Sequence, residues 1–220
     1  MKKVSIIAVL VLLLPLGVDA QWRVGVGMGA SYNTYSMDLQ YMTDCALGGK
    51  AGIHGAVMGQ YCFNDWFALR ADLDFTQRNW HYFRKLYEIF DHVYFNEYLL
   101  LPVMASLSCG GSRLRGFLNL GMYGGYWLSA ERSGKDYDSA SDRPYNFGEH
   151  LEFNYKKDQR WDYGAVAGLG MEYRFARHWA VQLEARYWYS MESQVKQYMK
   201  VKDYRYNNTS TFQVGMFYCF

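Results

Sequence analysis

The feature that most constrains this chain is a two-residue alternation of apolar and polar or small side chains, which recurs in separate segments along its length. In the final segment, TFQVGMFYCF, bulky apolar residues occupy every second position: Phe212, Val214, Met216, Tyr218 and Phe220. An extended strand points successive side chains to opposite faces, so these five share one face. The alternation therefore predicts an ordered β-strand with one uniformly apolar face.

The same pattern predicts eight strands, at residues 22–31, 51–63, 66–77, 95–108, 113–130, 161–175, 179–190 and 211–220. Beyond residue 20, no apolar run approaches the roughly 18 residues that a membrane-spanning helix requires. The longest run, LLLPVMASL, is much shorter and contains Pro102. If the chain spans a membrane, strands must do so.

Residues 1–20 have the composition of an export signal. Lys2 and Lys3 precede an apolar run, and Val18 and Ala20 occupy the small-residue positions of a cleavage site. The alternative, an N-terminal membrane anchor, is less favoured because the run is too short to span a bilayer. We therefore expect a signal peptide at 1–20 and a single domain at 21–220, in an exported protein.

The connections between the predicted strands differ in length in a regular way. FNDW, CGGSR and FARHW form tight turns, whereas the other connections, at about 32–47, 79–93, 131–160 and 190–208, are long. Short turns at one end and long loops at the other are typical of outer-membrane barrels. The sequence thus predicts an all-β, eight-stranded, antiparallel up-and-down transmembrane β-barrel in the bacterial outer membrane, with short turns and termini in the periplasm.

Alternation alone cannot distinguish a barrel in lipid from a soluble β-protein, because each has one apolar face. Three further features favour the membrane. The export signal and the aromatic C-terminus at Phe220 fit a bacterial outer membrane. The polar face is rich in glycine, which suits a crowded interior. Aromatic residues gather at both strand ends, like the two girdles of a membrane barrel, at Trp22, Trp66, Phe175, Trp179 and Phe220 on the short-turn side and at Trp80, Tyr94, Trp127, Trp161 and Tyr189 on the long-loop side.

Several blocks taken in order carry a family resemblance: YCFNDWFALRADLDFTQ, FLNLGMYGGYWLSAE, WDYGAVAGLGMEYRF, HWAVQLEARYWYS and FQVGMFYCF. Together they resemble the PorT-like outer-membrane β-barrel family over nearly the whole mature chain. The resemblance implies an eight-stranded barrel, and some members are associated with secretion of surface proteins. This chain departs from the family pattern at Leu100, where members often carry an acidic residue before the Leu-Pro pair.

Charged residues on the inward face are the nearest thing to a functional site: Arg70, Asp72, Asp74, Glu172, Arg174, Glu184 and Arg186. In a narrow lumen these charges should pair and form a structural plug, because unpaired buried charges are costly. The alternative is a proton or ion path, that is, a narrow channel. Pairing Gly170 with Glu184 and Gly168 with Arg186 avoids opposing two glutamates, so we expect that register.

An enzyme is the second class of function, since some outer-membrane barrels hydrolyse or transfer lipid acyl chains. The candidate residues all lie in or beside the long loops: Ser139, Ser141, Asp142, Glu149 and His150, with His81 and His92. Neighbours in a loop do not establish a catalytic triad, so we expect no catalytic site.

The histidine and cysteine spacings likewise predict no metal site, and we expect no cofactor. The four cysteines, Cys45, Cys62, Cys109 and Cys219, leave three disulfide pairings open.

The expected partners follow from the predicted barrel. Outer-membrane lipid and lipopolysaccharide would cover the apolar face, and the barrel-assembly machinery would recognise the terminal strand from Phe212 to Phe220, as the resemblance to outer-membrane barrels implies. The third long loop mixes charge with Tyr and Phe, so it is either a recognition surface for secretion-complex or surface proteins or a solvated cap. A formal net charge of only +2 gives no indication of nucleic-acid binding. We therefore expect a non-enzymatic structural or interaction protein.

Overall fold

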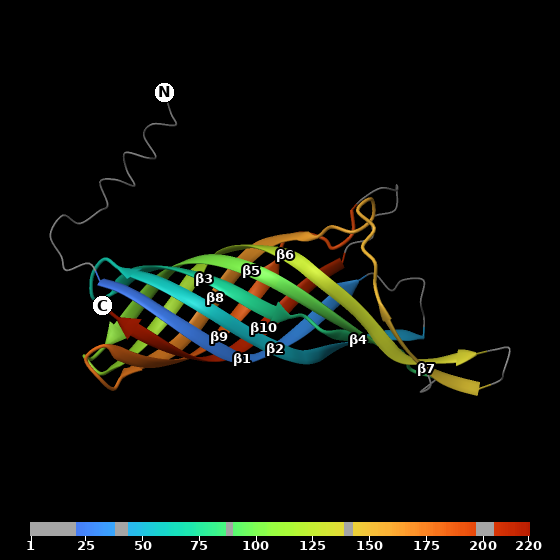
Figure 1. Cartoon of the computed structure of the whole chain (residues 1–220), viewed down its shortest axis with the longest axis horizontal. Coiled ribbons are helices and arrows are strands. Elements are labelled where there is room, and N and C mark those ends of the chain that lie inside the picture. The colour runs from blue at the N-terminus through green and yellow to red at the C-terminus, as the bar shows by residue number, and fades with distance from the viewer. Residues whose placement is uncertain (1–20, 38–43, 87–89, 139–142, 197–204) are drawn as a thin grey trace, which may run out of the picture.

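The computed structural model of the chain describes residues 21–37, 44–86, 90–138, 143–196 and 205–220. These residues form an all-strand structure (Figure 1). Its strands are β1 (Gln21–Met37), β2 (Cys45–Cys62), β3 (Phe67–Gln77), β4 (Trp80–Arg84), β5 (Asp91–Gly110), β6 (Leu114–Asp138), β7 (Arg143–His150), β8 (Trp161–Arg174), β9 (Trp179–Ser190) and β10 (Arg205–Cys219). Among the residues described, no helix has the length and apolar character needed to cross a membrane.

Eight of the strands close into a ring in which every neighbouring pair is antiparallel. Around the ring, β1 pairs with β2, β2 with β3, β3 with β5 and β5 with β6. The second half follows the same order: β6 pairs with β8, β8 with β9, β9 with β10, and β10 with β1. The last pairing joins the two ends of the chain and leaves the ring without an open edge. The predicted eight-stranded up-and-down barrel is confirmed.

The long connections differ from their description as loops, because two of them contain further strands. β4 continues the line of β3 between β2 and β5, after an interruption at Arg78 and Asn79. The Arg78 amide donates to the Asn96 carbonyl over 2.8 Å at this interruption. β4 has the sequence WHYFR, whose aromatic residues favour strands but show no two-residue alternation, which is why the pattern missed it.

The longest strand, β6, leaves the ring and forms a hairpin with β7. β7 pairs with β6 from Glu131 to Asp138, within the connection that the sequence predicted as the third long loop. In Figure 1 this hairpin projects from the end of the barrel opposite to the C-terminus and the start of β1. The long-loop end is therefore built largely from continued strands. Following the orientation expected from the sequence, this end is called extracellular and the short-turn end periplasmic.

The two faces of the ring carry the side chains that the alternation predicted. On the outer face, the large exposed apolar side chains of the ring strands range from 37% exposed at Tyr218 to 75% at Met28, and the set includes Leu69, Leu73, Leu169, Leu183, Phe212, Val214, Met216 and Phe220. The polar and charged side chains alternate with these and are buried inside the ring. The outer surface is thus apolar along the whole ring.

The aromatic girdle predicted at the long-loop end requires correction. Trp161 and Tyr189 are exposed on the outer face, but Trp80 is only 8% exposed and lies inside the ring. Its ring stacks between Tyr35 and Tyr94, with centroid distances of 4.1 and 4.0 Å. Trp127 packs against a buried apolar cluster. Inward-facing indoles therefore fill the extracellular mouth and do not contact lipid.

A single extra residue in β6 changes the facing of that strand. Tyr98 of β5 is opposite Trp127, whereas the preceding Glu97 is opposite Ser129, so Leu128 has no partner on β5. Such a bulge shifts the alternation by one residue. Below it, Tyr123 faces inward at an odd position, and above it Ala130 is buried at an even one.

Candidate functional site

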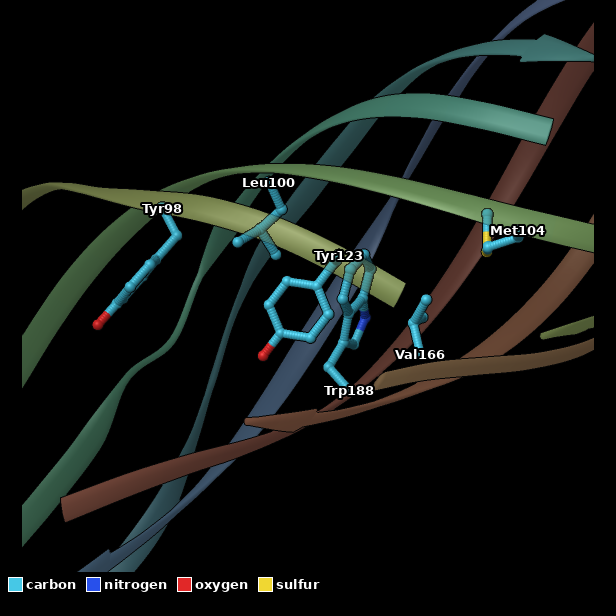
Figure 2. Close-up of a cluster of buried hydrophobic side chains, with 6 residues drawn as sticks. All are labelled: Tyr98, Leu100, Met104, Tyr123, Val166 and Trp188. Carbon is cyan, nitrogen blue, oxygen red and sulfur yellow. The ribbon is translucent and has the colours of Figure 1, made fainter. Parts of the chain in front are cut away.

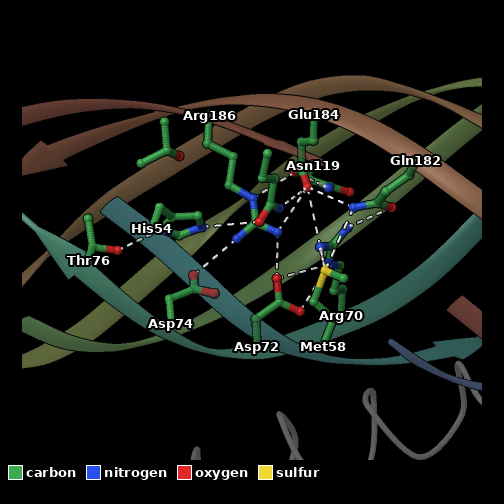
Figure 3. A network of polar contacts seen from close by, with 12 residues as sticks. His54, Met58, Arg70, Asp72, Asp74, Thr76, Asn119, Gln182, Glu184 and Arg186 are labelled. Atoms are coloured by element: carbon green, nitrogen blue, oxygen red, sulfur yellow. Dashed lines mark hydrogen bonds and ion pairs between the residues drawn. The ribbon is translucent and has the colours of Figure 1, made fainter. Parts of the chain in front are cut away.

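The charged residues in the middle of the lumen form one connected network, drawn in Figure 3. The Arg186 guanidinium donates to Asp72 Oδ2 over 2.5 Å and to Asp74 Oδ2 over 3.1 Å. It also donates to Glu184 Oε2 over 2.9 Å. Arg70 Nε donates to both oxygens of Asp72 over 3.0 Å, and Arg70 Nη2 lies 3.2 Å from Glu184 Oε2. None of these five residues is more than 3% exposed. Two guanidinium groups and three carboxylates therefore interlock away from solvent.

Neutral side chains satisfy the remaining lone pairs of the central carboxylate. Asn119 Nδ2 and Gln213 Nε2 each donate to Glu184 over 2.7 Å. His54 links the network to the wall: its Nε2 is 3.1 Å from Gln213 Oε1, and its Nδ1 is 2.7 Å from Thr76 Oγ1. A buried carboxylate is stabilised when each oxygen receives hydrogen bonds, so these amides support the ion pairs.

The strand register that places this network agrees with the sequence-based expectation. Gly168 is opposite Arg186, and Gly170 is opposite Glu184. A Cβ atom added at Gly168 would lie 2.5 Å from Glu184 Oε1 and 3.1 Å from Arg186 Cγ, so this glycine makes room for the charged pair. The space above Gly170 is taken by the ring of Phe117, whose Cζ would lie 2.4 Å from an added Cβ.

The seven inward charges predicted as a single set do not form a single network. Glu172 lies nearer the periplasmic end, where both of its oxygens accept hydrogen bonds from Arg23 over 3.0 Å. Arg174 is only partly buried and lines a periplasmic vestibule of about 610 Å³ together with Arg23 and Arg115. The set is therefore split by depth along the barrel axis.

A second buried ion pair, above the central network, was not singled out by the sequence analysis. Arg78 Nη1 lies 2.5 Å from Asp162 Oδ2, and the Arg78 side chain is fully buried. The same carboxylate accepts hydrogen bonds from Tyr123 over 3.1 Å and, through Oδ1, from Ser190 over 2.5 Å. The Arg78 guanidinium also lies 4.9 Å from the centre of the Tyr98 ring. Arg78 lies just beyond the end of β3 but shares the even, inward positions of Asp74 and Thr76, so the count of faces could have placed it inside.

An apolar layer separates the charged network from the extracellular mouth. As Figure 2 shows, its side chains come from strands on several sides of the ring and converge in the lumen: Tyr98, Leu100, Met104, Tyr123, Val166 and Trp188. Leu100 is completely buried in this layer, beside the Asp74 position on the neighbouring strand. Where the family resemblance leads one to expect an interior acid, this chain has an apolar contact.

The described residues among the catalytic candidates each pair with a different partner. Ser139, Ser141 and Asp142 fall outside the described residues, as does the predicted signal peptide. His150 Nδ1 is 3.9 Å from Glu131, whereas Glu149 pairs with Arg132. His81 pairs with Asp91 over 3.5 Å and His92 with Asp136 over 3.6 Å.

The described part of the chain contains no group of three or more His, Cys, Asp or Glu side chains that could hold a metal ion. The four cysteines are free thiols, and Cys219 is the most buried of them.

The terminal strand is held at the closure of the ring. The Phe220 amide donates to the Trp22 carbonyl over 3.1 Å, and the Phe220 ring meets Tyr218 edge to face at 5.1 Å. Phe220 itself is 66% exposed on the outer face. The side chains of Tyr218 and Phe220 are thus presented outward, next to β1, whereas Phe217 is buried inside the ring.

Comparison with solved structures supports the fold. The outer membrane protein OprG from Pseudomonas aeruginosa is similar with a TM-score of 0.54 and 12% identity, covering 91% of this chain and 97% of that one. Neisserial surface protein A aligns over 90% and 96% with a TM-score of 0.48 and 14% identity. Ail of Yersinia pestis aligns over 91% and 99% with a TM-score of 0.45 and 11% identity. At these identities the likeness concerns the fold alone.

Comparison at the level of sequence gives the family. No curated protein matches the sequence. The family model described as "outer membrane protein beta-barrel domain" matches residues 18–191, which is most of the chain. Together with the closed ring and its apolar outer surface, this match places the protein in the bacterial outer membrane. The chain belongs to the outer membrane protein β-barrel domain family.

Proposed function

We propose that this protein is a closed, non-enzymatic outer-membrane barrel that presents its extracellular strands and loops to partners, in the export or display of surface proteins. The observation that carries the first part is the filled lumen. A charged layer around Glu184 and an apolar layer around Leu100 occupy successive levels of the same interior, and both layers are buried. An eight-stranded ring has an interior that side chains just fill.

Several cavity volumes support a barrel without a continuous water column. The periplasmic vestibule of about 610 Å³ and an extracellular pocket of about 250 Å³ lie at opposite ends of the lumen. Between the vestibule and the charged layer, a cavity lined by Arg23, Gln60 and Arg70 has a volume of about 10 Å³. Such a volume holds about one water molecule.

Planar-bilayer recording tests the closed interior. The unmodified protein should give no stable, reproducible channel steps. Glu184→Ala should lower stability before it opens a path, because it leaves Arg70 and Arg186 with a partner removed. Robust, ion-selective steps in the unmodified protein would contradict the plug. They would indicate a narrow channel in which the same charges act as a selectivity filter.

The role in export or display rests on the family resemblance and on the projecting β6–β7 hairpin, whose Tyr137 and Tyr145 are exposed. Crosslinking in intact outer membranes, followed by purification of this chain, should recover defined surface or secretion-complex proteins. The control is a variant in which Tyr137 and Tyr145 are replaced by Ser, which should lose those crosslinks while the barrel stays folded. Recovery of the barrel alone would contradict the interaction role.

An acyl-chain assay on lipopolysaccharide separates this proposal from an enzyme. We expect no release or transfer of acyl chains. Activity that disappears in His150→Ala would overturn the non-enzymatic assignment.

The outward terminal strand supports a further expectation, that the barrel-assembly machinery recognises Phe220. Deleting Phe220 should reduce the amount of folded protein in the outer membrane, measured by the heat-modifiable gel mobility of barrels. The control is Trp161→Ala, which removes an exposed aromatic side chain at the other end of the ring. An unchanged amount of folded protein in the outer membrane after deletion of Phe220 would contradict the assembly role.

A further inference from the structure

We propose that the extracellular mouth of the barrel contains a binding site for a single neutral sugar residue, either free or at the end of a surface glycan. This inference is independent of the export role. It starts from a pocket of about 250 Å³ that opens at the extracellular end. The volume lies just below the roughly 300 to 1,000 Å³ of sites for drug-sized ligands, so it suits one ring.

The walls of this sugar pocket are aromatic and come from five separate segments: Tyr35 of β1, Trp80 of β4, Tyr94 of β5, Trp127 of β6 and Phe153. Tyr35, Trp80 and Tyr94 form a parallel stack with interplanar angles of 9° and 5°. Trp127 meets Phe153 edge to face at 4.8 Å. Rings that pack on one another are held rigidly, so the apolar surface offered to a ligand is already in place.

One polar atom in the wall lacks a partner. Trp127 lines the pocket, and its Nε1 is buried without a hydrogen-bond acceptor among the described residues. Indole nitrogen is a donor only, and a buried donor without an acceptor is unfavourable. A ligand that brings an acceptor oxygen to Nε1 would remove this defect.

The remaining lining offers both donors and acceptors. Glu152 and Asp158 contribute carboxylates and Arg205 contributes a guanidinium, whereas the amide nitrogens of Asn96 and Gln194 already donate to the Arg78 carbonyl and the Tyr98 hydroxyl. Among the described lining residues, carboxylates outnumber cations, which disfavours an anionic ligand. A hydroxyl-bearing ring matches this set, because each hydroxyl both donates and accepts while the C–H faces of the ring lie on aromatic side chains.

A quaternary ammonium group is the other ligand that aromatic walls with nearby carboxylates could hold. It has no acceptor for Trp127 Nε1, so the unpaired donor favours the sugar. The inner side of the pocket adjoins the apolar layer, since Gln194 donates to the hydroxyl of Tyr98, which belongs to that layer. The pocket therefore lies on the side of the apolar layer toward the long loops, where a surface glycan would approach.

The test is calorimetric titration of the folded full-length chain in lipid nanodiscs with glucose, galactose and N-acetylglucosamine, and with tetramethylammonium, which has no acceptor, as the ammonium probe. We expect weak binding of at least one neutral sugar and none of tetramethylammonium. Titration with the lipid-free oligosaccharide of lipopolysaccharide distinguishes the source, since tighter binding than the free sugar assigns a glycan terminus and equal binding assigns the free sugar. Binding of tetramethylammonium alone, or of no probe, would overturn the proposal.

Variants place the ligand in this pocket. Trp127→Phe keeps a ring but removes the Nε1 donor, and should weaken binding about threefold to tenfold, as the loss of one hydrogen bond does. Trp161→Phe is the matched control, because Trp161 lies on the adjacent strand but is 65% exposed on the outer face. Glu152→Gln, at an exposed position of the rim, should fold normally and also weaken binding. If both Trp127→Phe and Glu152→Gln bind the sugar with the affinity of the parent protein, the site is contradicted.

Discussion

The two faces of β9 are stabilised in opposite ways: the outer face by lipid and the inner face by specific partners on other strands. Leu183, Tyr187 and Tyr189 face outward and need only an apolar surrounding, which lipid supplies in any arrangement. On the inner face, Glu184 and Arg186 are buried and depend on partners in fixed positions on other strands. Outer-face positions should therefore tolerate changes of shape but not of polarity, whereas inner-face positions should tolerate neither. The following substitutions test this difference.

The largest loss is expected from Arg186→Met. Without this guanidinium, Asp72, Asp74 and Glu184 lose a shared partner, and breaking a buried ion pair costs about 3 to 5 kcal/mol. The control on the outer face of the same strand is Tyr187→Met, which should stay within about 0.5 kcal/mol, as substitutions away from specific contacts do. Urea-dependent unfolding from lipid vesicles gives both values. Similar losses in the two variants would remove the distinction between the faces.

Next in size is Leu100→Ala in the apolar layer. It leaves a cavity in a packed interior, and we expect a loss of about 2 to 5 kcal/mol. Leu101→Ala is the matched control, because Leu101 is the neighbouring residue and is 55% exposed on the outer face. Lipid chains can fill the space there, so the cavity contribution is absent and the loss should be clearly smaller. The same unfolding measurement applies, and a larger loss at Leu101 would contradict a packed lumen.

Leu183→Arg tests polarity on the outer face. A cationic side chain near the middle of the bilayer should cost about 2 to 4 kcal/mol, and Trp179→Arg, near the short-turn end of the same strand, about 0 to 1 kcal/mol. The adjacent inner position, Gln182, is unsuitable as a control because it accepts a hydrogen bond from Arg70 over 3.3 Å. Folding yield into vesicles, together with unfolding free energy, measures the effect. A cost that does not depend on depth would place this face outside the hydrocarbon region.

The smallest effect is that of one methyl group. Gly168→Ala would bring a Cβ to 2.5 Å from Glu184 Oε1, and overpacking of this kind costs about 1 to 3 kcal/mol. Gly124→Ala is the control, since nothing lies within 4 Å of the added Cβ there and the residue is exposed. The Gly124 variant should be as stable as the parent protein or slightly more so. A tolerated Gly168→Ala would show that the charged layer can rearrange.

Much of the barrel could be predicted because alternation is a local property. The strand segments, their number and the Gly168 to Arg186 register all follow from side-chain facing and from the avoidance of opposed like charges. Trp127 could have been placed inside by the same rule, since it shares the odd positions of Asn119 and Tyr123 on β6. The expectation of a membrane girdle at this residue took precedence over the count of faces.

Other features depend on contacts across the lumen and leave no local pattern. Arg186 meets Asp74 although the two are 112 residues apart, and Arg78 meets Asp162 at a separation of 84 residues. Which residues share a level is set by the tilt and stagger of the closed ring. The inward direction of Trp80, by contrast, follows the count of faces, because Trp80 shares the even positions of Asp74, Thr76 and Arg78; here too the expectation of a girdle took precedence. The division of the lumen into layers was for these reasons visible only in three dimensions.

The extra residue Leu128 gives the two ends of β6 different sets of inward-facing positions. Because it resets the inward-facing positions where the strand leaves the ring, the hairpin beyond it obeys its own facing rule. The bulge thus separates the facing of the exposed β6–β7 hairpin from the facing that packs the lumen. One inserted residue lets a single continuous strand meet the different requirements of two surfaces.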